Sequence, residues 1–511
     1  MQHQTIWILD FGSQYTQLIA RRVREFGVYC EIMPCTDQAP EAFPARVIGL
    51  ILSGGPASVL GDDAPEFDAG WLQTTVPVLG ICYGMQVLAH LGGGLVHRGE
   101  SREYGSGSLS LETNPGALFQ GFEPGVSHPV WMSHGDHVEN PPEGFRVVGR
   151  SGGIMAAIAS DDERRFGLQF HPEVSHTQDG ALMIQNFLKG VCQANGDWTP
   201  GSFVEEKVAE LRQLVGEKHV ICGLSGGVDS SVTAALLQRA IGERLHCIFV
   251  DNGLLREGEV SSIREEFQDF DLTVVDARDR FLNALEEYTD PEKKRKIIGE
   301  IFVRVFEEES HRFPDATFLA QGTLYPDVIE SVSVRGPSAV IKSHHNVGGL
   351  PEDMKFSLIE PLRELFKDEA RAVGETLGLS EERVWRQPFP GPGLAVRCLG
   401  DLSRSRLVTL RKADAIVREE IIAGGWGRKV WQYFAVLLPV RTVGVMGDER
   451  TYDEVCAIRA IHSNDGMTAD WAHLPYSMLG KMSSRIINEV QGINRVVYDI
   501  SSKPPATIEW E

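Results

Sequence analysis

Seven residues, SGGVDSS from Ser225 to Ser231, form the first pattern in this sequence with a chemical meaning. An apolar run, HVICGL, precedes them and a helical pattern follows, so the glycine-rich turn opens a helix. Backbone N–H groups in such a turn converge on an anion, and the helix N-terminus adds partial positive charge. The pattern therefore indicates a phosphate site, although an ordinary helix cap begins with the same residue types. It lacks the spacing of a Walker A loop.

Cys82 lies in a second pattern, GICYGMQ, between an apolar run and a helical stretch. The start of a helix favours the thiolate, which is the nucleophilic form of a cysteine. Another apolar run ends in GLQFHPE, where His171 can act as a base and Glu173 can orient its imidazole. The loop LSGGP, residues 52–56, offers glycine N–H groups for an oxyanion hole. These residues predict nucleophilic catalysis by cysteine, and a buried structural cysteine is the alternative.

Length and composition limit the classes of function. The 511 residues are too many for one core, and about 150 residues per domain predicts about three domains. A formal net charge of -22 argues against nucleic-acid partners, because affinity for phosphate backbones comes from clustered Lys and Arg. No run approaches the roughly 18 apolar residues that cross a membrane, and no signal sequence is evident, so we expect a cytoplasmic protein. The 8 cysteines form no CxxC pair, so neither a disulfide framework nor a zinc site is expected.

Alternating strand-like and helical stretches divide the chain into three predicted domains. Residues 1–196 alternate apolar runs such as VIGLILSGG with helical stretches, which is typical of a mostly parallel α/β sheet. The turn-rich NGDWTPGSF marks a first boundary, after which residues 197–386 repeat the α/β pattern. A Pro- and Gly-rich stretch, RQPFPGPG, marks a second boundary before residues 387–511. We expect an α/β protein with two successive doubly wound, mostly parallel-sheet domains followed by a small α+β domain.

The cysteine, histidine and glutamate motifs together resemble a class I glutamine amidotransferase domain across nearly all of residues 1–196. The resemblance implies that Cys82 attacks the carboxamide of glutamine, that His171 transfers protons and that Glu173 positions His171. An acyl thioester then forms, ammonia leaves, and water releases glutamate. The residues implied for the oxyanion hole are Gly55 and Tyr83, and those implied for the glutamine pocket are Gln86 with Ser133 and His134 in an expected loop, residues 132–136.

The SGGVDSS turn resembles the signature loop of N-type ATP pyrophosphatases, which cleave ATP between the α and β phosphates and transfer AMP to an acceptor oxygen. The expected cofactor is Mg²⁺ bound with ATP, because this ion binds few carboxylates and keeps several waters. The residues implied for ATP are Ser225, Gly226, Gly227, Val228, Asp229, Ser230 and Ser231, with Asp229 as a metal contact.

A later stretch, IKSHHNVGGLP at residues 341–351, resembles a mobile lid that brings Lys342 onto the phosphates. Asp327 and Glu330, in QGTLYPDVIES, are then expected to hold Mg²⁺ or the lid. A plain surface loop is the alternative for residues 341–351. Adjacent histidines without further ligands are typical of polar loops, so no transition metal is expected.

The order of these domains and the ending SSKPPATIEWE resemble the family of glutamine-hydrolysing GMP synthases over essentially the full chain. The resemblance implies that ATP adenylylates the xanthine C2 oxygen of xanthosine monophosphate (XMP), and that ammonia then displaces AMP to give GMP. It also implies a homodimer through the C-terminal domain. The alternatives are a solvated helix face for EKKRK, residues 292–296, and a frayed tail for the ending. The expected XMP contacts are Arg295, Gln432, Arg495, Lys503 and Glu509.

Three other functions fit parts of the pattern. A ligase acting on deamido-NAD also consumes ammonia, but that family usually pairs its pyrophosphatase with a nitrilase-type glutaminase. A tRNA-thiolating enzyme shares the phosphate loop, yet it is expected to have a basic face and catalytic cysteines near ATP. A nucleotide-sensing binding protein without catalysis has no need of the intact cysteine, histidine and glutamate set.

Overall fold

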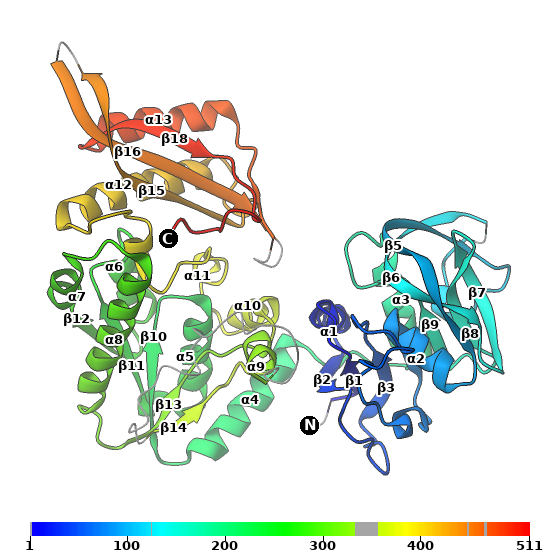
Figure 1. The fold of residues 1–511 in the computed structure, drawn as a ribbon. Helices are drawn as coiled ribbons and strands as arrows, with labels where there is room; N and C mark the ends of the chain where they lie inside the picture. Colours follow the sequence, from blue (N-terminus) through cyan, green and yellow to red (C-terminus); the bar gives the residue numbers. More distant parts are fainter. Residues whose placement is uncertain (1–2, 124, 333–355, 447–448, 464–467) are drawn as a thin grey trace. The chain divides into compact units, whose positions relative to one another are not determined.

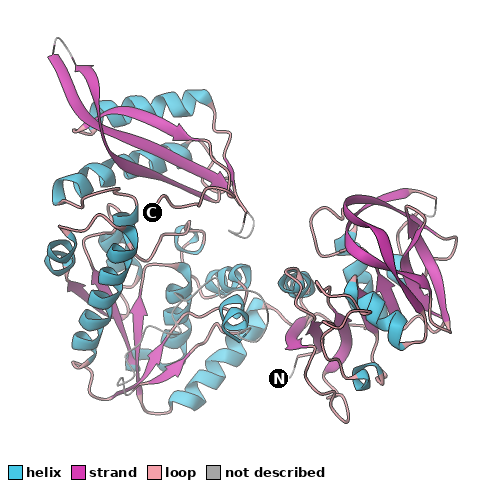
Figure 2. Ribbon diagram, viewed as in Figure 1, coloured by secondary structure: helices cyan, strands magenta, loops and turns pink. Residues whose placement is uncertain are grey.

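The computed structural model describes residues 3–123, 125–332, 356–446, 449–463 and 468–511. The chain forms two compact units, Met1–Phe203 and Val204–Glu511 (Figure 1). In both units the strands form central sheets with helices packed beside them (Figure 2). In the part of the chain that the structure describes, no helix is both long enough and apolar enough to cross a membrane.

The first unit is built on a 9-stranded mixed sheet. Its parallel half has the order β2 (Tyr29–Pro34), β1 (Thr5–Asp10), β3 (Val47–Leu52), β4 (Val78–Ile81) and β9 (Arg165–Leu168). Its antiparallel half continues with β8 (Ile154–Ser160), β7 (Phe145–Ser151), β5 (Leu95–Leu111) and β6 (Ser127–Asn140). Strand β9 joins the halves, because it pairs with β4 in parallel and with β8 antiparallel. The strand-like runs predicted in residues 1–196 are therefore neighbouring parallel strands.

Short helices complete this unit, and one of them begins at the candidate nucleophile. Strands β1 and β3 are almost wholly buried, as expected for parallel strands covered on both faces. Helix α2 follows β4 directly and contacts β3, β4 and β9. The helices are α1 (Thr16–Glu25), η1 (Ala69–Leu72), α2 (Tyr83–Leu91), η2 (Ala117–Phe119), α3 (Gly180–Gln185) and the π-helical η3 (Asn186–Val191).

The second unit contains a 5-stranded parallel sheet in the order β12 (Asp271–Asp276), β11 (Leu245–Asp251), β10 (His219–Leu224), β13 (Ala316–Ala320) and β14 (Ser357–Ile359). Successive strands are added on one side of β10 and then on the other. In open α/β sheets, ligands bind beyond the carboxyl end of the strand where the order reverses. The residues directly after β10 are SGGVDSS, so the topology places the predicted phosphate loop at this switch point.

Helices flank this parallel sheet. Helix α5 packs on β10 and β11 and against α10, and α8 packs on β11 and against α7. They are α4 (Pro200–Val215), α5 (Val228–Ile241), η4 (Gly242–Arg244), α6 (Glu259–Glu266), α7 (Arg278–Leu285), α8 (Pro291–Ser310), α9 (Tyr325–Val332), α10 (Lys367–Thr376) and α11 (Glu381–Val384).

The last part of the second unit is a smaller sheet with two helices. Strands β15 (Gln432–Met446) and β16 (Glu449–His462) form a long antiparallel pair, and β16 also pairs with β17 (Asp470–Trp471) and β18 (Ile493–Asp499). Helix α12 (Arg404–Ala423) packs on β15 and against α13 (Tyr476–Glu489), which packs on β18; η5 (Gly393–Val396) precedes them. One apolar cluster joins Ile221 of β10 to Leu437 of β15. These observations confirm the expected fold class.

Candidate active sites

Cys82 lies at a sharp turn between β4 and α2. It is the N-cap of α2 with φ 51° and ψ -104°, a backbone conformation that non-glycine residues rarely adopt, and it is 4% exposed. The flanking glycines allow this turn to pack tightly. A Cβ at Gly84 would lie 2.3 Å from the backbone oxygen of Leu52, and one at Gly80 would lie 2.6 Å from Gly84. The spacing of GICYG therefore places the thiol beside the end of β3.

His171 and Glu173 form a buried pair beside this cysteine. Nδ1 of His171 lies 2.7 Å from Oε1 of Glu173, and both residues are at most 3% exposed. Burial alone disfavours the imidazolium, but the charge of Glu173 and hydrogen bonds with Cys82 and Glu173 outweigh it and raise the pKa of His171 to about 11. The structure thus brings the predicted cysteine, histidine and glutamate together, and this surrounding raises the pKa of His171.

The LSGGP loop lies against the same residues. A Cβ at Gly54 would lie 3.1 Å from Cε1 of His171, and one at Gly55 would lie 3.4 Å from Cγ of Tyr83. Ser53 fixes the loop, because its hydroxyl accepts a hydrogen bond from the N–H of Phe11 at 3.0 Å. The backbone of Gly55 and the first residue of α2 are therefore neighbours, as an oxyanion hole requires.

The segment predicted as a glutamine-binding loop, residues 132–136, has a different structure from the one expected. Ser133 and His134 lie within β6, where they pair with Tyr104 and Glu103 of β5, so the prediction of a loop is wrong. The glycine and aspartate of MSHGD are typical turn residues, but the pairing with β5 overrides this local preference. The segment still lies at the thiol, since the backbone oxygen of Ser133 is 3.5 Å from Sγ of Cys82.

Gln86 holds this strand to the helix that carries the thiol. Its Nε2 donates a hydrogen bond of 2.8 Å to the backbone oxygen of Asp136, and the residue is 3% exposed. His134 is also buried, and burial lowers its pKa despite the nearby carboxylate of Glu103. Ser133 thus contacts the thiol directly, His134 follows it on β6, and Gln86 joins β6 to α2.

The SGGVDSS turn forms a cradle at the start of α5, with Gly227 as the N-cap. Gly226 has φ 76°, which a residue with a side chain rarely adopts. The hydroxyl of Ser230 accepts from the N–H of Ser225 at 3.2 Å, and that of Ser231 donates to the backbone oxygen of Gly227 at 2.9 Å. The serines thus brace the turn from inside, and its N–H groups lie at a helix N-terminus that attracts anions.

Asp229, in the first turn of α5, faces elements from elsewhere in the chain. Its carboxylate pairs with Nζ of Lys367, the first residue of α10. A Cβ at Gly322 would lie 3.0 Å from the backbone of Asp229, so QGTLYPDVIES packs directly against the cradle. Asp327 caps this segment, because its carboxylate accepts from the N–H of Leu324 at 3.2 Å. Lys342 lies outside the described residues, as does the side chain of Glu330 on α9.

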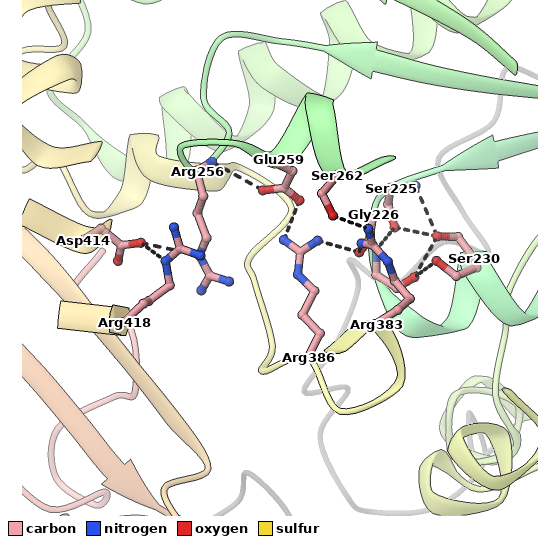
Figure 3. Close-up of polar contacts among 12 residues, drawn as sticks. Ser225, Gly226, Ser230, Arg256, Glu259, Ser262, Arg383, Arg386, Asp414 and Arg418 are labelled. Carbon is pink, nitrogen blue, oxygen red and sulfur yellow. Dashed lines mark hydrogen bonds and ion pairs between the residues drawn. The ribbon is translucent and has the colours of Figure 1, made fainter. Parts of the chain in front are cut away.

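Arginines back the cradle on its other side (Figure 3). Arg383 and Arg386 both donate to the backbone oxygen of Gly226, at 2.8 and 2.7 Å. Arg256 is 6% exposed, and burial lowers its pKa to about 9 although Asp414 of α12 opposes this shift. Asp414 also faces Arg418 at 3.2 Å, so charged groups continue from the cradle into the C-terminal elements.

Only some of the residues expected to bind XMP lie close together in the structure. Gln432 donates to Oε1 of Glu509 at 2.9 Å, and Arg397 holds the same carboxylate with bonds of 3.0 and 2.7 Å. Arg295 donates to the backbone oxygen of Glu511 at 2.5 Å. Lys503 lies on the same segment and pairs through its backbone with Ala469. Arg495 is exposed on β18, and no hydrogen bond or ion pair joins it to the other four within the described ranges.

Several residues at these sites carry no signal in the sequence. Lys367 is 138 positions from Asp229, and Arg383 and Arg386 are 157 and 160 positions from Gly226. Lys294 is fully buried and donates to the carboxylate of Glu511 at 2.7 Å. Among these residues, only Lys294 lies in a pattern that was noticeable in the sequence, the basic run at residues 292–296. In the part of the chain that the structure describes, no group of three or more His, Cys, Asp or Glu side chains could hold a metal ion.

Comparison with known proteins gives matches along most of the chain. A model of class-I glutamine amidotransferases matches residues 7–191, an NAD synthase model matches residues 201–273, and a model of the GMP synthase C terminal domain matches residues 419–510. A GMP synthase (glutamine-hydrolysing) of Nitratidesulfovibrio vulgaris strain DP4 is 58% identical over 517 residues, covering 100% of both chains. Those of Brachyspira hyodysenteriae and Clostridium perfringens are 56% and 54% identical and cover 99% of both chains.

The chain belongs to the glutamine-hydrolysing GMP synthase family. The resemblance read from the sequence is thereby confirmed, and so is the expectation of a ligase that uses glutamine as its amido donor. The NAD synthase model alone would also fit the deamido-NAD alternative. However, it covers only residues 201–273, whereas the GMP synthase C terminal domain model matches residues 419–510 and the relatives named GMP synthase match the full chain.

A change at Glu173 tests the electrostatics of the triad. The raised pKa means that the protonated His171 stabilises the fold below its ordinary value of 6.5, and that this contribution is lost as the pH rises through about 11. In Glu173→Gln the charge that favours the imidazolium is removed, so we expect the pKa of His171 to fall and glutamine hydrolysis to slow by about 10²-fold or more. Histidine NMR titration and glutamate release measure the two effects.

The matched control for this change is Glu163→Gln. Glu163 pairs with Arg146 in the same unit at 2.6 Å and is not part of the triad. This variant should leave the pKa of His171 unchanged. An unchanged pKa in Glu173→Gln would contradict the electrostatic role given to Glu173.

Proposed function

We propose that the chain makes GMP from XMP, ATP and glutamine through two separate sites. The carrying observation is that the chain contains both the assembled Cys82, His171 and Glu173 set and the Gly226 cradle, within a full-length match to glutamine-hydrolysing GMP synthases. Residues 1–196 serve as the amidotransferase domain, residues 197–386 as the ATP pyrophosphatase domain and residues 387–511 as the XMP-binding and dimerisation domain.

At the first site, the thiolate of Cys82 attacks the carboxamide carbon of glutamine. The imidazolium of His171 donates its proton to the departing ammonia, and Glu173 holds the ring in position at 2.7 Å. The N–H groups of Gly55 and Tyr83 bind the oxyanion, and one such donor is worth roughly 2.7–4 kcal/mol in the transition state. Water then attacks the thioester, with His171 as the base, and releases glutamate. Gln86, Ser133 and His134 line the glutamine pocket.

At the second site, residues 225–231 hold the pyrophosphate part of ATP. The xanthine C2 oxygen of XMP attacks the α phosphorus, pyrophosphate leaves, and the oxygen bears AMP. Ammonia then attacks C2, and AMP departs with that oxygen to give GMP. Both displacements depend on donors that neutralise phosphate charge, which the N–H groups of the cradle and Lys367 supply. Lys342 and Glu330 are proposed to act from the lid segment and α9.

The residues beside the cradle fit a divalent cation. Oδ1 of Asp229 and Oε1 of Gln321 are buried oxygens without a hydrogen-bond partner among the described residues. Carboxylate and amide oxygens suit Mg²⁺, and Asp327 lies on the same segment as Gln321. When bound with ATP, Mg²⁺ would neutralise charge on the phosphates. Asp229 and Gln321 would orient it.

The acceptor site is proposed to hold XMP through Gln432, Lys503 and Glu509, with Arg295 on its phosphate. Arg397 fixes the carboxylate of Glu509 by two hydrogen bonds, which gives that carboxylate one orientation. Arg495 lies exposed on β18, and the strands beside it expose Val445 and Tyr452 at 72% and 59%. Exposed apolar side chains of this kind support a homodimer in which a second copy covers this sheet. We place the reaction in the cytoplasm.

The proposal is tested with a panel of acceptors. The purified protein receives Mg-ATP and ammonium with XMP, deamido-NAD, aspartate or UTP, and pyrophosphate release is measured. We expect release with XMP alone. Turnover with another acceptor, or none with XMP, would refute the assignment.

Loss of the thiol should separate the two sites. In Cys82→Ala we expect glutamine-dependent GMP synthesis to be abolished, because no thioester forms, while ammonia-dependent synthesis persists. The measurement is GMP formation with each nitrogen source. Cys35→Ala, a buried cysteine outside the triad, should retain both routes. If Cys82→Ala loses both routes although it is folded, the role of the thiol is misassigned.

Loss of the cradle carboxylate should have the opposite effect. In Asp229→Ala we expect both synthetic routes to fall by about 10²-fold or more, because the cation and Lys367 lose their shared partner. Glutamine hydrolysis should persist, as measured by glutamate release. Asp269→Ala replaces an exposed aspartate of the same unit and serves as the control. An unchanged synthetic rate in Asp229→Ala would exclude the carboxylate from the reaction.

A further inference from the structure

The backbone oxygen of Gly226 is held by two guanidinium groups at once. Nη1 of Arg383 lies 2.8 Å from it and Nη1 of Arg386 lies 2.7 Å from it (Figure 3). Arg383 is 3% exposed, and the side chain of Arg386 is 16% exposed. Burying two long cationic side chains behind one carbonyl has a cost in desolvation and side-chain entropy, so their partners must fix them firmly.

Those partners lie on one face of α6. Glu259, Ser262 and Glu266 are spaced i, i+3 and i+7, which aligns them along a helix. Arg383 donates to Glu266 at 2.7 Å and to Ser262 at 3.2 Å, and Arg386 pairs with Glu259. Two carboxylates thus balance two guanidinium groups. The group adds little net charge to the phosphate loop, and its contribution is to the geometry of that loop.

The geometry follows from the planarity of the peptide bond. In a trans peptide, the carbonyl of one residue and the N–H of the next point in opposite directions. When the arginines hold the oxygen of Gly226 behind the loop, the N–H of Gly227 is turned to the front. There it donates to the hydroxyl of Ser225 at 3.3 Å, which in turn lies 3.1 Å from the hydroxyl of Ser230.

The segment that follows these arginines reaches the acceptor site. The side chain of Gln387 accepts from the N–H of Tyr433 at 2.8 Å, and the backbone oxygen of Pro388 accepts from Gln432 at 3.3 Å. Gln432 also contacts Glu509. One short stretch of chain, residues 383–388, therefore contacts both the phosphate loop and the side chain expected to bind XMP.

We propose that Arg383 and Arg386 are positioning residues for the ATP reaction: they lock the Gly226–Gly227 peptide so that its N–H, together with the Ser225 hydroxyl that it contacts, lies on the side of the loop that faces the pyrophosphate. The inference rests on the proposed function, because it needs phosphate in front of the loop. The arginines act through the peptide and the adjoining chain, and the peptide contacts the phosphate. Their removal should therefore impair the turnover of bound substrates more than the binding of either substrate.

Arg386→Lys is the first test. Lysine keeps the charge, but its donors share one nitrogen, so it lacks the planar fork in which separate Nη1 and Nη2 atoms of Arg386 bond the Gly226 oxygen and Glu259. In the full-length protein, with ammonium, XMP and Mg-ATP, we expect kcat for pyrophosphate release to fall by about 10–10²-fold, as for small misplacements of a reacting group. The KM for XMP should change by less than about threefold, and Arg386→Ala should regain activity with added guanidinium ion.

A control variant and a second variant distinguish the positioning role from a general effect of the substitution. Arg428→Lys changes an exposed arginine that pairs with Glu381 of α11 without contacting the loop, and should leave kcat unchanged. Glu259→Gln removes the partner that orients Arg386, and should lower kcat as Arg386→Lys does, with no further loss when the two are combined. Thermal melting of each variant shows whether it is folded.

Three results would overturn the proposal. The first is a kcat within about twofold of wild type in folded Arg386→Lys and Glu259→Gln. The second is a loss that merely follows a lowered melting temperature and is not restored by guanidinium. The third is additive effects in the double variant. If the wild-type protein releases no pyrophosphate with XMP, the proposed function fails instead, so the two failures are distinguishable.

Discussion

Both candidate sites depend on the close approach of backbone segments at the carboxyl ends of parallel strands. N–H groups can face a ligand there only where no side chain separates neighbouring turns. At the thiol, a Cβ on Gly84 would lie 2.3 Å from the oxygen of Leu52. At the phosphate loop, a Cβ on Gly322 would lie 3.0 Å from the backbone of Asp229. The distance at Gly84 is shorter than real Cβ contacts, so glycine is a steric requirement there, and the distance at Gly322 is tighter than most real Cβ contacts.

The two sites stabilise charged groups in different ways. At the thiol, burial opposes the imidazolium of His171, but the buried carboxylate of Glu173 outweighs that cost and raises the pKa of His171. At the phosphate loop, the arginines behind the turn are balanced by Glu259 and Glu266, and Asp229 is balanced by Lys367. Attraction for the anion must then come from oriented N–H groups and a cation. In the proposed function, acyl transfer relies on the buried His171–Glu173 pair, whereas phosphoryl transfer relies on N–H dipoles that are aligned before the phosphate binds.

The features that could be predicted correctly are those that depend on residues close together in the sequence. The turns around Cys82 and Gly226 were recognisable because their glycines, the preceding strand and the following helix are contiguous. The same local view mistook part of β6 for a loop, since only β5, paired at Glu103 and Tyr104, makes MSHGD a strand. The available signal in the sequence was the apolar residues at alternate positions of β6, Val130, Met132 and Val138. The arginines behind Gly226 could not be found at all, because contacts across more than 150 residues leave no spacing to read.

Apolar packing and polar contacts have separate roles in the second unit. The apolar cluster runs from β10 and β11 through η5 and α12 to β15, so it joins the two sheets, but apolar contacts are non-directional and leave their orientation free. Directional contacts remove that freedom. Asp414 of α12 is 1% exposed and faces Arg256, Arg397 and Arg418 within 3.9 Å, and Arg397 continues to Glu509. A buried carboxylate among arginines adds little net stability, because desolvation offsets the attraction. The effect of these directional contacts is to permit one arrangement of the surrounding elements. In that arrangement the carboxylate of Glu509 is aligned with the parallel sheet, whose central strand β10 ends at the phosphate loop.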